Sequence, residues 1–332
     1  MINRNGGEYL RGALKSLRAA MAHAWNIFQE VELILVDNGS TDSSIAIMQE
    51  AMSGAQWEWR ILEEKTPGCN SARNAGLRDS HGSHVIFTDN DLTFDVNWLV
   101  GYYNAIRAFP QQRVFAGRVK VGNIEGAIPS WLDIDGDYSR PCIVVRCDNG
   151  ESEIVADLND ETLAGPVGPN MAFARSIFDD YGAFNIEFGL RPGSLVPGAE
   201  AELFHRFGKH RESFVYVPQA CVFHPLKKNQ ICQTYFRRRL SGVGQVLARM
   251  QRLDGIKAKR IFGIKRYLFR QLATAYLRYL ATWFQQSDRK RFFHRCNISM
   301  LWGQMKEDYQ YYCRTQSGNV QNKSTIQSTP IT

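Results

Sequence analysis

The sequence lacks both a cysteine framework and a long apolar segment. Its seven cysteines include no C-x-x-C pair, and their odd number argues against a complete set of disulfides. We therefore expect a reducing, cytoplasmic location as the default. No run of 18 or more uncharged apolar residues occurs, so no transmembrane helix is predicted. The polar residues Asn3-Arg4-Asn5, two positions after Met1, predict no signal peptide.

Acidic residues are scarce in one long segment of the chain. Between Lys227 and Arg295 there are 18 Lys and Arg residues against two acids, Asp254 and Asp288, although the net charge of the whole chain is only +7. The rest of the chain is therefore acidic on balance. This asymmetry predicts an acidic body with a basic helical extension that faces something anionic.

Within the basic segment, an amphipathic helix is predicted around residues 266–284. One i, i+4 row of this helix consists of Arg266, Arg270, Thr274, Arg278 and Thr282. Aromatic and aliphatic residues cover most of the remaining helix surface. Two interpretations stay open: peripheral contact with an anionic membrane surface, which we favour, or packing into a core with a homodimer contact. Nucleic acid is not an expected partner, because no RNA-binding motif accompanies the basic residues.

Two apolar segments each end in acidic residues. Residues 85–87 lead into Asp89-Asn90-Asp91, and residues 31–36 lead into Asp37-Asn38. Both patterns predict a buried strand that ends in a turn. Because the ligand crevice of a parallel sheet opens beyond the carboxyl ends of its strands, we expect the three aspartates to face one crevice. Carboxylates bind hard cations such as Mg²⁺ and Mn²⁺, which often retain substrate phosphates as further ligands.

A loop that enters a helix lies between these two strand ends. Residues 67–77 are mostly small and contain one arginine, Arg73. Small residues permit the close approach of a ligand, and a guanidinium places a fixed positive charge against a phosphate. Each motif alone is more often an ordinary turn or loop than a site, so the inference depends on their combination.

In this order the motifs resemble the inverting nucleotide-sugar glycosyltransferases of family 2, which have the GT-A fold. The matching segments are Asn3-Arg4-Asn5, Val36-Asp37-Asn38-Gly39-Ser40-Thr41-Asp42, Ala72-Arg73-Asn74-Ala75-Gly76, Asp89-Asn90-Asp91, Gly168-Pro169-Asn170-Met171-Ala172-Phe173, Gly182-Ala183-Phe184, Gly198-Ala199-Glu200-Ala201-Glu202-Leu203 and His224. The resemblance implies an α/β fold with a mostly parallel central sheet flanked by helices. It also implies a nucleotide-sugar donor, with a UDP-sugar as the first candidate, and Mg²⁺ or Mn²⁺ as cofactor.

The resemblance also implies roles for individual residues. Donor binding falls to Asp37, Asn38, Ser40, Arg73, Asp89 and Asn90, metal binding to Asp91, Asp89 and His224, and acceptor binding to Asn170 and Glu202. For His224 a structural role stays open. The family pattern Glu-Asp-x-Glu-Leu is altered here, because Ala199 stands at the usual Glu and Glu200 at the usual Asp. We favour Glu200 over Glu202 as the general base that accepts the proton of the acceptor hydroxyl.

The front of the chain departs from the family pattern. Relatives begin with an apolar strand before the turn that Asn3-Arg4-Asn5 matches, whereas this sequence opens inside that turn. A central strand is therefore expected to be missing from the sheet, which a parallel core tolerates poorly. Three explanations stay open: a start upstream of Met1, another segment in the same slot, or an impaired protein.

The predicted function is that of an inverting glycosyltransferase that moves a sugar to a hydroxyl of a glycan or lipid-linked acceptor. The alternative is a non-catalytic or N-terminally truncated sugar-nucleotide-binding homologue. A nucleotidyltransferase would need a Gly-rich, basic loop near its start, for which Asn5-Gly6-Gly7 is too weak. The expected organisation is a GT-A domain over residues 1–226, with a nucleotide-sugar half (1–120) and an acceptor half (121–226), a basic helical extension (227–316) and a disordered tail (317–332).

Overall fold

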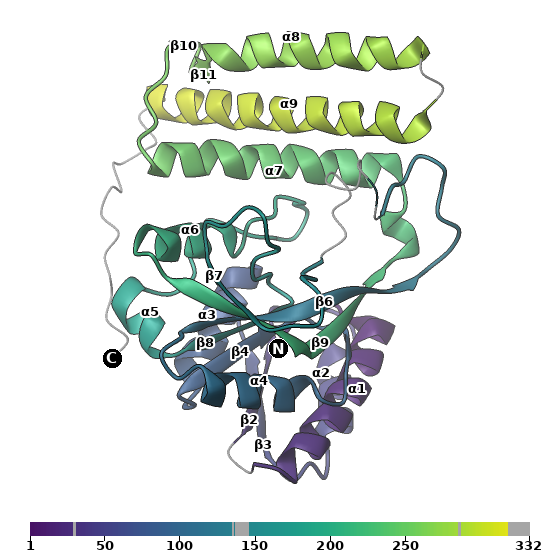
Figure 1. Cartoon of the computed structure of the whole chain (residues 1–332), viewed down its shortest axis with the longest axis vertical. Helices are drawn as coiled ribbons and strands as arrows, with labels where there is room; N and C mark the ends of the chain where they lie inside the picture. The colour runs from purple at the N-terminus through teal and green to yellow at the C-terminus, as the bar shows by residue number, and fades with distance from the viewer. Residues whose placement is uncertain (29–30, 135, 137–145, 285–286, 318–332) are drawn as a thin grey trace.

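The structure, a computed structural model, describes residues 1–28, 31–134, 136, 146–284 and 287–317. Figure 1 shows an α/β body at one end and three long helices stacked beyond it at the other. This arrangement confirms the predicted α/β class with a helical C-terminal region. The predicted disordered tail lies outside the described residues from position 318 onward.

Three parallel strands form the first sheet, in the order β1-β2-β3. They are β1 (Ile2–Asn3), β2 (Glu32–Asp37) and β3 (Glu58–Glu63). The helices between and after them are α1 (Gly7–Trp25), α2 (Ser44–Met52) and α3 (Cys69–Asp79). Apolar residues recur along α1 at helical spacing, and Leu10, Leu14, Leu17 and Met21 are all buried in the main core.

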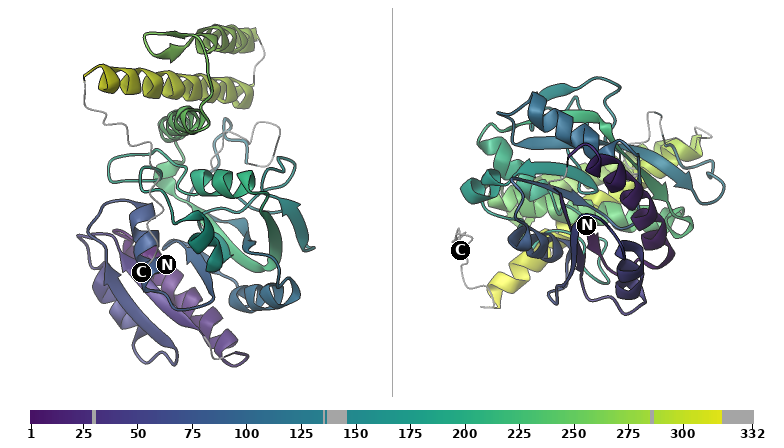
Figure 2. Two further views of the ribbon diagram at one scale, coloured as in Figure 1. Left: turned by 90° about the vertical axis from the view of Figure 1, so that its left-hand side faces the viewer. Right: turned by 90° about the horizontal axis from the view of Figure 1, so that it is seen from below.

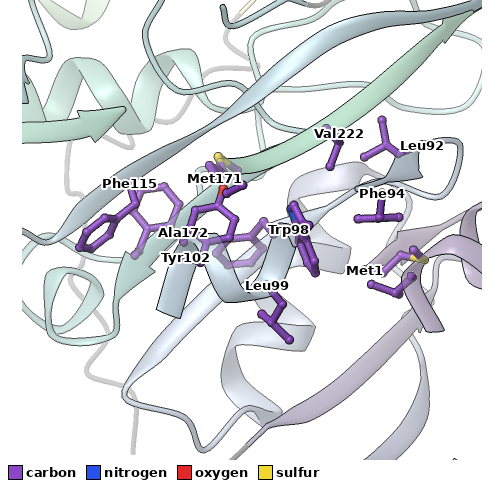
Figure 3. Packing of buried hydrophobic residues seen from close by; sticks show 14 of the residues in the cluster. Met1, Leu92, Phe94, Trp98, Leu99, Tyr102, Phe115, Met171, Ala172 and Val222 are labelled. Carbon is purple, nitrogen blue, oxygen red and sulfur yellow. The ribbon is translucent and has the colours of Figure 1, made fainter. Parts of the chain in front are cut away.

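The second sheet is mixed, in the order β4-β8-β6-β9-β5, with β7 paired to β9. Its strands are β4 (His84–Thr88), β5 (Thr93–Phe94), β6 (Val114–Ile124), β7 (Ile154–Asp157), β8 (Asn170–Ala174) and β9 (Ser213–Leu226). Its helices are α4 (Trp98–Ala108), α5 (Ser176–Tyr181) and α6 (Ala201–Lys209). Figure 3 shows Trp98 and Tyr102 of α4 packed beside Met171 and Ala172 of β8, deep in the core.

A gap separates the two sheets. Within the described residues β4 is the last strand of its sheet, and β1 covers only the end of β2 through the pairs Ile2↔Val36 and Asn3↔Asp37. A cavity of about 1190 Å³ is lined by residues of both β2 and β4. The amino group of Met1 donates to the carbonyl of Ile34 (2.9 Å), and burial lowers the pKa of this amine to about 5. The sequence analysis expects a central strand to be missing here, and the strand present at this edge of β2 is β1, of two residues.

The C-terminal region consists of three layered helices and a short hairpin. After β9 come η1 (Lys228–Gln230), α7 (Gln233–Leu253), β10 (Arg260–Ile261), β11 (Ile264–Lys265), α8 (Arg266–Ala281), η2 (Thr282–Phe284) and α9 (Asp288–Gln316). Figures 1 and 2 show α7 nearest the body, α9 in the middle and α8 outermost. None of the helices that the structure describes is long and apolar enough to cross a membrane.

Close packing and buried ion pairs hold these three helices together. A Cβ atom at Gly303 of α9 would lie 1.9 Å from the carbonyl oxygen of Ser241 on α7, so the two helices touch through backbone. The buried Lys265 Nζ lies 3.0 Å from the carboxylate of Asp308, which is also buried. The basic extension therefore contains a buried acid, Asp308, that neutralises Lys265. Asp308 lies after residues 227–295, the segment that is strongly positive.

Candidate active site at the strand ends

Asp37, at the carboxyl end of β2, is held by hydrogen bonds on both oxygens. Its Oδ1 accepts from Asn3 Nδ2 (3.0 Å) and from Ser40 Oγ (2.5 Å), and its Oδ2 accepts from the Ser40 backbone N–H (2.8 Å). The side chain is almost completely buried. A buried carboxylate needs such donors, so the turn after β2 is organised around this charge.

Asn38 joins this turn to the loop before α3. Its Nδ2 donates to the carbonyls of Glu64 (2.9 Å) and Thr66 (2.8 Å), and its Oδ1 accepts from the Gly68 N–H (2.8 Å). These three bonds fix the beginning of α3 beside the end of β2. The helix that carries Arg73 therefore starts at the predicted donor site.

Asn3 links the ends of the two sheets. Besides its bond to Asp37, its Nδ2 donates to Ser40 Oγ (3.1 Å), and its Oδ1 accepts from Asn90 Nδ2 (2.5 Å). A Cβ atom at Gly6 would lie 2.4 Å from Asn3 Oδ1 and 2.7 Å from Asn90 Nδ2, so only glycine leaves room for this contact. The amide of Asn3 therefore connects the turn after β2 with the turn after β4.

Arg73 of α3 lies buried beside Asp89. Its Nη2 is 3.4 Å from Asp89 Oδ1, and the guanidinium carbon is 5.7 Å from the centre of the Phe184 ring. A Cβ atom at Gly168 would approach Nη2 to 2.6 Å, so this glycine makes space for the guanidinium. The Nε of Arg73 is buried without a hydrogen-bond partner. Arg73 thus retains donor capacity that an anionic ligand can use.

Several charges act together on Asp89. Burial is the largest influence and raises the pKa of Asp89, Arg73 lowers it, and Asp91 raises it again. His224 and Glu200 also act on the same carboxyl group through their charges. The structure therefore brings Arg73, Asp91, Glu200 and His224 near one carboxylate, although they come from four separate parts of the chain.

Asp91 has a partner that the sequence analysis did not assign to the site. The Lys227 Nζ lies 2.6 Å from Asp91 Oδ2. Burial acts to raise the pKa of Asp91, but His224 and Lys227 outweigh it and hold that pKa below its usual range. The Nδ1 of His224 lies 2.9 Å from the carbonyl oxygen of Pro225. Since a carbonyl can only accept, Nδ1 carries a proton, and in the neutral imidazole Nε2 is then the nitrogen whose lone pair can bind a ligand.

The two glutamates near the start of α6 have different surroundings. Glu200 is half-buried at the N-cap position, where its Oε1 accepts from the Gly168 N–H at 3.3 Å. Glu202 is buried, and both of its oxygens are bonded by Arg206, at 3.0 Å to Nε and 2.9 Å to Nη2. Glu200 therefore has free acceptor positions, whereas Glu202 serves as the counter-ion of Arg206. The acceptor role of Glu202 stays a prediction.

Asn170, at the start of β8, is fully buried, and its amide group is saturated. Its Nδ2 donates to the carbonyls of Arg118 (3.0 Å) and Ala220 (2.7 Å). Its Oδ1 accepts from Trp98 Nε1 (2.8 Å) and Tyr102 Oη (2.9 Å). An asparagine side chain can make about four such bonds, so in this structure Asn170 braces the sheet, and its predicted acceptor contact stays a prediction.

The donor set for a divalent cation is present, but it is not preassembled. Asp89, Asp91 and His224 offer two carboxylates and an imidazole nitrogen, which are ligands that Mg²⁺ or Mn²⁺ accept. Among the described residues, however, no three His, Cys, Asp or Glu side chains already surround a common point, and Lys227 lies against one oxygen of Asp91. The residues fit a cation by their chemistry, and phosphate or water oxygens would complete its shell.

Two residues of this site were missed in the assignment of roles from sequence. Asn3 belongs to the segment Asn3-Arg4-Asn5 that carried the resemblance, but a neutral amide gives no sign that it will bond an aspartate 34 positions away. Lys227 directly follows β9, three residues after His224. A polar residue at the carboxyl end of a strand was the available signal, and it was obscured by the many other basic residues that follow.

Comparison with known proteins gives consistent matches. The family model described as "Glycosyl transferase family 2" matches residues 1–182. Glycosyltransferase AglE of Haloferax volcanii is 22% identical over 234 residues, which is 70% of this chain and 68% of that protein. Glycosyltransferase GlyA of Streptococcus pneumoniae is 31% identical over 104 residues, or 31% of this chain and only 14% of that protein. This chain thus matches a small part of some relatives and about two thirds of another.

Solved structures share the fold. S. aureus TarS 1-349 in complex with UDP-GlcNAc has a TM-score of 0.52 at 14% identity, and the match covers 96% of this chain and 90% of that chain. Mannosyltransferase PcManGT from Pyrobaculum calidifontis, in complex with GDP-Man and Mn²⁺, has a TM-score of 0.52 at 15% identity, with 91% and 85% covered. At this level of identity the likeness concerns the fold.

Proposed function

We propose, from the premise that this chain belongs to glycosyltransferase family 2, that it transfers a sugar from a nucleotide-sugar donor to an acceptor hydroxyl with inversion at the anomeric carbon. The observation that carries this proposal is the cluster around Asp89: the Arg73 guanidinium lies 3.4 Å from its carboxylate, Asp91 follows two positions on, and the charges of His224 and Glu200 also reach it. Displacement of a nucleoside diphosphate is helped by a fixed positive charge, here Arg73, and by acids that can hold a metal ion, here Asp89 and Asp91. It also needs a base with free acceptor positions, here Glu200.

The donor-binding part is assigned to the ends of β2 and β4. Asp37, with Asn38 and Ser40, forms the rigid turn where the base or ribose of the nucleotide would bind, and its buried network supports a preformed site. Arg73 faces the diphosphate, and its unpartnered Nε supports this role. Asn90 connects to the turn after β2 through Asn3, and Asp89 lies beside Arg73.

A divalent cation, Mg²⁺ or Mn²⁺, would be held by Asp91 and Asp89, with the Nε2 of His224 as a further ligand. When bound, such a cation neutralises the negative charge of the departing diphosphate. The tautomer that the Pro225 carbonyl imposes on His224 supports its ligand role. Of the two solved relatives described above, PcManGT holds Mn²⁺ with its donor.

Glu200 is the proposed general base. Its position at the N-cap of α6 leaves it half-buried, with one long bond from Gly168 and remaining acceptor capacity. It would accept the proton as the acceptor hydroxyl attacks, which is worth about 10²–10⁴-fold in rate. No covalent intermediate is needed, since the attack comes from the face opposite the leaving diphosphate.

The acceptor is proposed to be a glycan or a lipid-linked sugar. Asn170 and Glu202 were predicted to bind it, but the buried bonds of both side chains support an indirect role behind the acceptor site. Leu277 of α8 and Trp283 and Phe284 of the following η2 are exposed, at 67%, 66% and 92%. Apolar exposure beside arginines supports a peripheral contact with an anionic membrane, where a lipid-linked acceptor would be found.

A sugar-nucleotide-binding protein without activity is the alternative, and the gap between β2 and β4 favours it. A cavity of about 1190 Å³ lies between these strands, and its lining includes Ile2 and Val36, the residues directly before Asn3 and Asp37. Binding of the donor without turnover is the property that separates this alternative from an active transferase.

The test is the release of nucleoside diphosphate from UDP-, GDP- and dTDP-sugars with Mn²⁺ or Mg²⁺, with glycan and lipid-linked acceptors. We expect turnover that falls at least about 100-fold in Glu200→Gln and in Asp91→Ala. Glu161→Gln is the matched control, because Glu161 is an exposed carboxylate in a loop outside the site. Donor binding without release, in protein that unfolds cooperatively, would support the alternative.

A further inference from the structure

Lys227 is the unexpected member of the site. It follows directly after β9, and its Nζ lies 2.6 Å from Asp91 Oδ2. The two side chains are 20% and 15% exposed, so the pair lies at the edge of the site and is shielded from most solvent. In the sequence Lys227 looks like the first residue of the basic extension. In the structure it is the counter-ion of the acid proposed to hold the metal.

The surroundings of Lys227 direct it toward Asp91. Its Nζ stands 4.1 Å from the centre of the Tyr9 ring, which favours a cation at that point. Tyr9 Oη bonds both oxygens of Glu125 (2.7 and 2.9 Å), and Glu125 also accepts the backbone N–H of Lys228 (3.0 Å). The ring and the backbone beside Lys227 are therefore fastened to the same glutamate.

Arg73 and Lys227, the basic partners of Asp89 and Asp91, differ in how far their charged groups can move. Arg73, next to Asp89, is buried and confined by Gly168 and Phe184. Lys227 has a longer flexible stem, a single point charge and partial exposure, so its ammonium can change partners within a short distance. A divalent cation at Asp91 would compete directly with this ammonium. The diphosphate of a donor would be the nearest new anion for it.

We propose that Lys227 is an exchangeable counter-ion: it neutralises Asp91 while the donor site is empty and moves to the diphosphate when cation and donor bind. The proposal rests on the proposed function for its second half. In the empty site, Lys227 would thereby offset the repulsion between the carboxylates of Asp89 and Asp91. Because its ammonium competes with the cation for Asp91, cation binding would be strongest when a diphosphate binds at the same time and takes the ammonium as its partner.

The first arm of the test measures Mn²⁺ alone, by electron paramagnetic resonance of the free ion, with wild type, Lys227→Met and the control Lys228→Met. The side chain of Lys228 is exposed and adjacent in sequence. Lys227→Met should bind Mn²⁺ roughly tenfold more tightly than wild type, because a competing charge has been removed. Lys228→Met should match wild type. Unchanged or weaker Mn²⁺ binding in Lys227→Met would overturn the proposal.

The second arm measures UDP and GDP in the presence of Mn²⁺, by calorimetry. Here Lys227→Met should bind the preferred diphosphate roughly tenfold more weakly, so the two arms change in opposite directions. Lys227→Arg should retain most of the diphosphate affinity. Loss of both affinities together would indicate a structural role and overturn the proposal, and Lys227→Gln repeats both arms if the Met variant does not fold.

These outcomes are distinguishable from a failure of the proposed function. If wild type releases no diphosphate from any donor, the transferase proposal fails, yet the Mn²⁺ arm still decides whether Lys227 competes for Asp91. If turnover is present and Lys227→Met changes neither affinity, the transferase proposal stands and the counter-ion proposal fails.

Discussion

The three aspartates at the strand ends have three different kinds of partner. Asp37 is bonded by neutral groups of Asn3 and Ser40, Asp89 lies near the fixed cation of Arg73, and Asp91 is paired with Lys227. Neutral donors hold a carboxylate in place without cancelling its charge, whereas a cation cancels the charge and competes with other cations. The three aspartates look alike in the sequence, but their different partners give them different charge environments in the site.

Asn3→Ala tests the connection between the sheets at the residue scale. The substitution removes donors to Asp37 and Ser40 and the acceptor for Asn90, so a buried carboxylate loses one of its partners. We expect the free energy of unfolding to fall by about 1–3 kcal/mol, measured by urea denaturation, and nucleotide affinity to fall with it. The control Asn229→Ala removes an exposed amide in η1 and should leave both unchanged. Equal stability of the two variants would contradict the role assigned to Asn3.

At the scale of elements, the backbone hydrogen bonding of the body is interrupted between β2 and β4 in the described residues. A strand that has a partner on only one edge leaves backbone groups unpaired along the other. The core elsewhere continues across α4, β8, β6 and β9 without such a break. The site spans this gap, so its two halves are joined by side chains such as Asn3 and Arg73 rather than by a continuous sheet.

The contact between α7 and α9 gives a prediction for elements. A methyl group at Gly303 would lie 1.9 Å from the Ser241 carbonyl oxygen, so Gly303→Ala should destabilise the protein by about 1–3 kcal/mol. Gly12→Ala in α1 is the matched control, because its Cβ meets nothing within 4 Å and alanine is the better helix former. In thermal unfolding, Gly303→Ala should lower the midpoint temperature, and Gly12→Ala should leave it unchanged or raise it. A neutral Gly303→Ala would mean that the helices are packed less closely than described.

At the scale of the whole molecule, the outermost helix is the one with the most exposed apolar side chains. Helix α8 buries Leu268, Leu272 and Ala275 against α9, and in Figure 2 it is the outermost of the three long helices. Leu277 on α8, and Trp283 and Phe284 on the following η2, are exposed beside exposed arginines. Part of the predicted apolar surface therefore forms a core, and the rest remains available to a partner.

Sedimentation with lipid vesicles tests this surface. The protein should bind vesicles that contain anionic lipid and should bind neutral vesicles weakly. Arg270→Glu with Arg278→Glu should weaken binding, at about 1 kcal/mol for each lost charge, and Leu277→Glu should reduce it at any salt concentration. Val96→Glu, at an exposed apolar position of the body, is the control. A stable dimer that Leu277→Glu dissociates, together with no vesicle binding, would favour the homodimer instead.

The sequence by itself determined the class of the protein and the set of polar residues at its site. Strand-end acids such as Asp37 and Asp89 are visible because burial of the preceding apolar residues is a local pattern, and a helix such as α8 is visible from its periodicity. Only the tertiary structure decided which of these side chains remain free. Asn170 is saturated by partners at least 50 positions away, Glu202 is bonded by Arg206 one turn further along α6, and Lys227 is a partner of Asp91 because β9 ends beside the turn after β4. Bonds between segments 50 or more positions apart, such as those of Asn170 and Lys227, follow from chain topology, and no local pattern in the sequence encodes them.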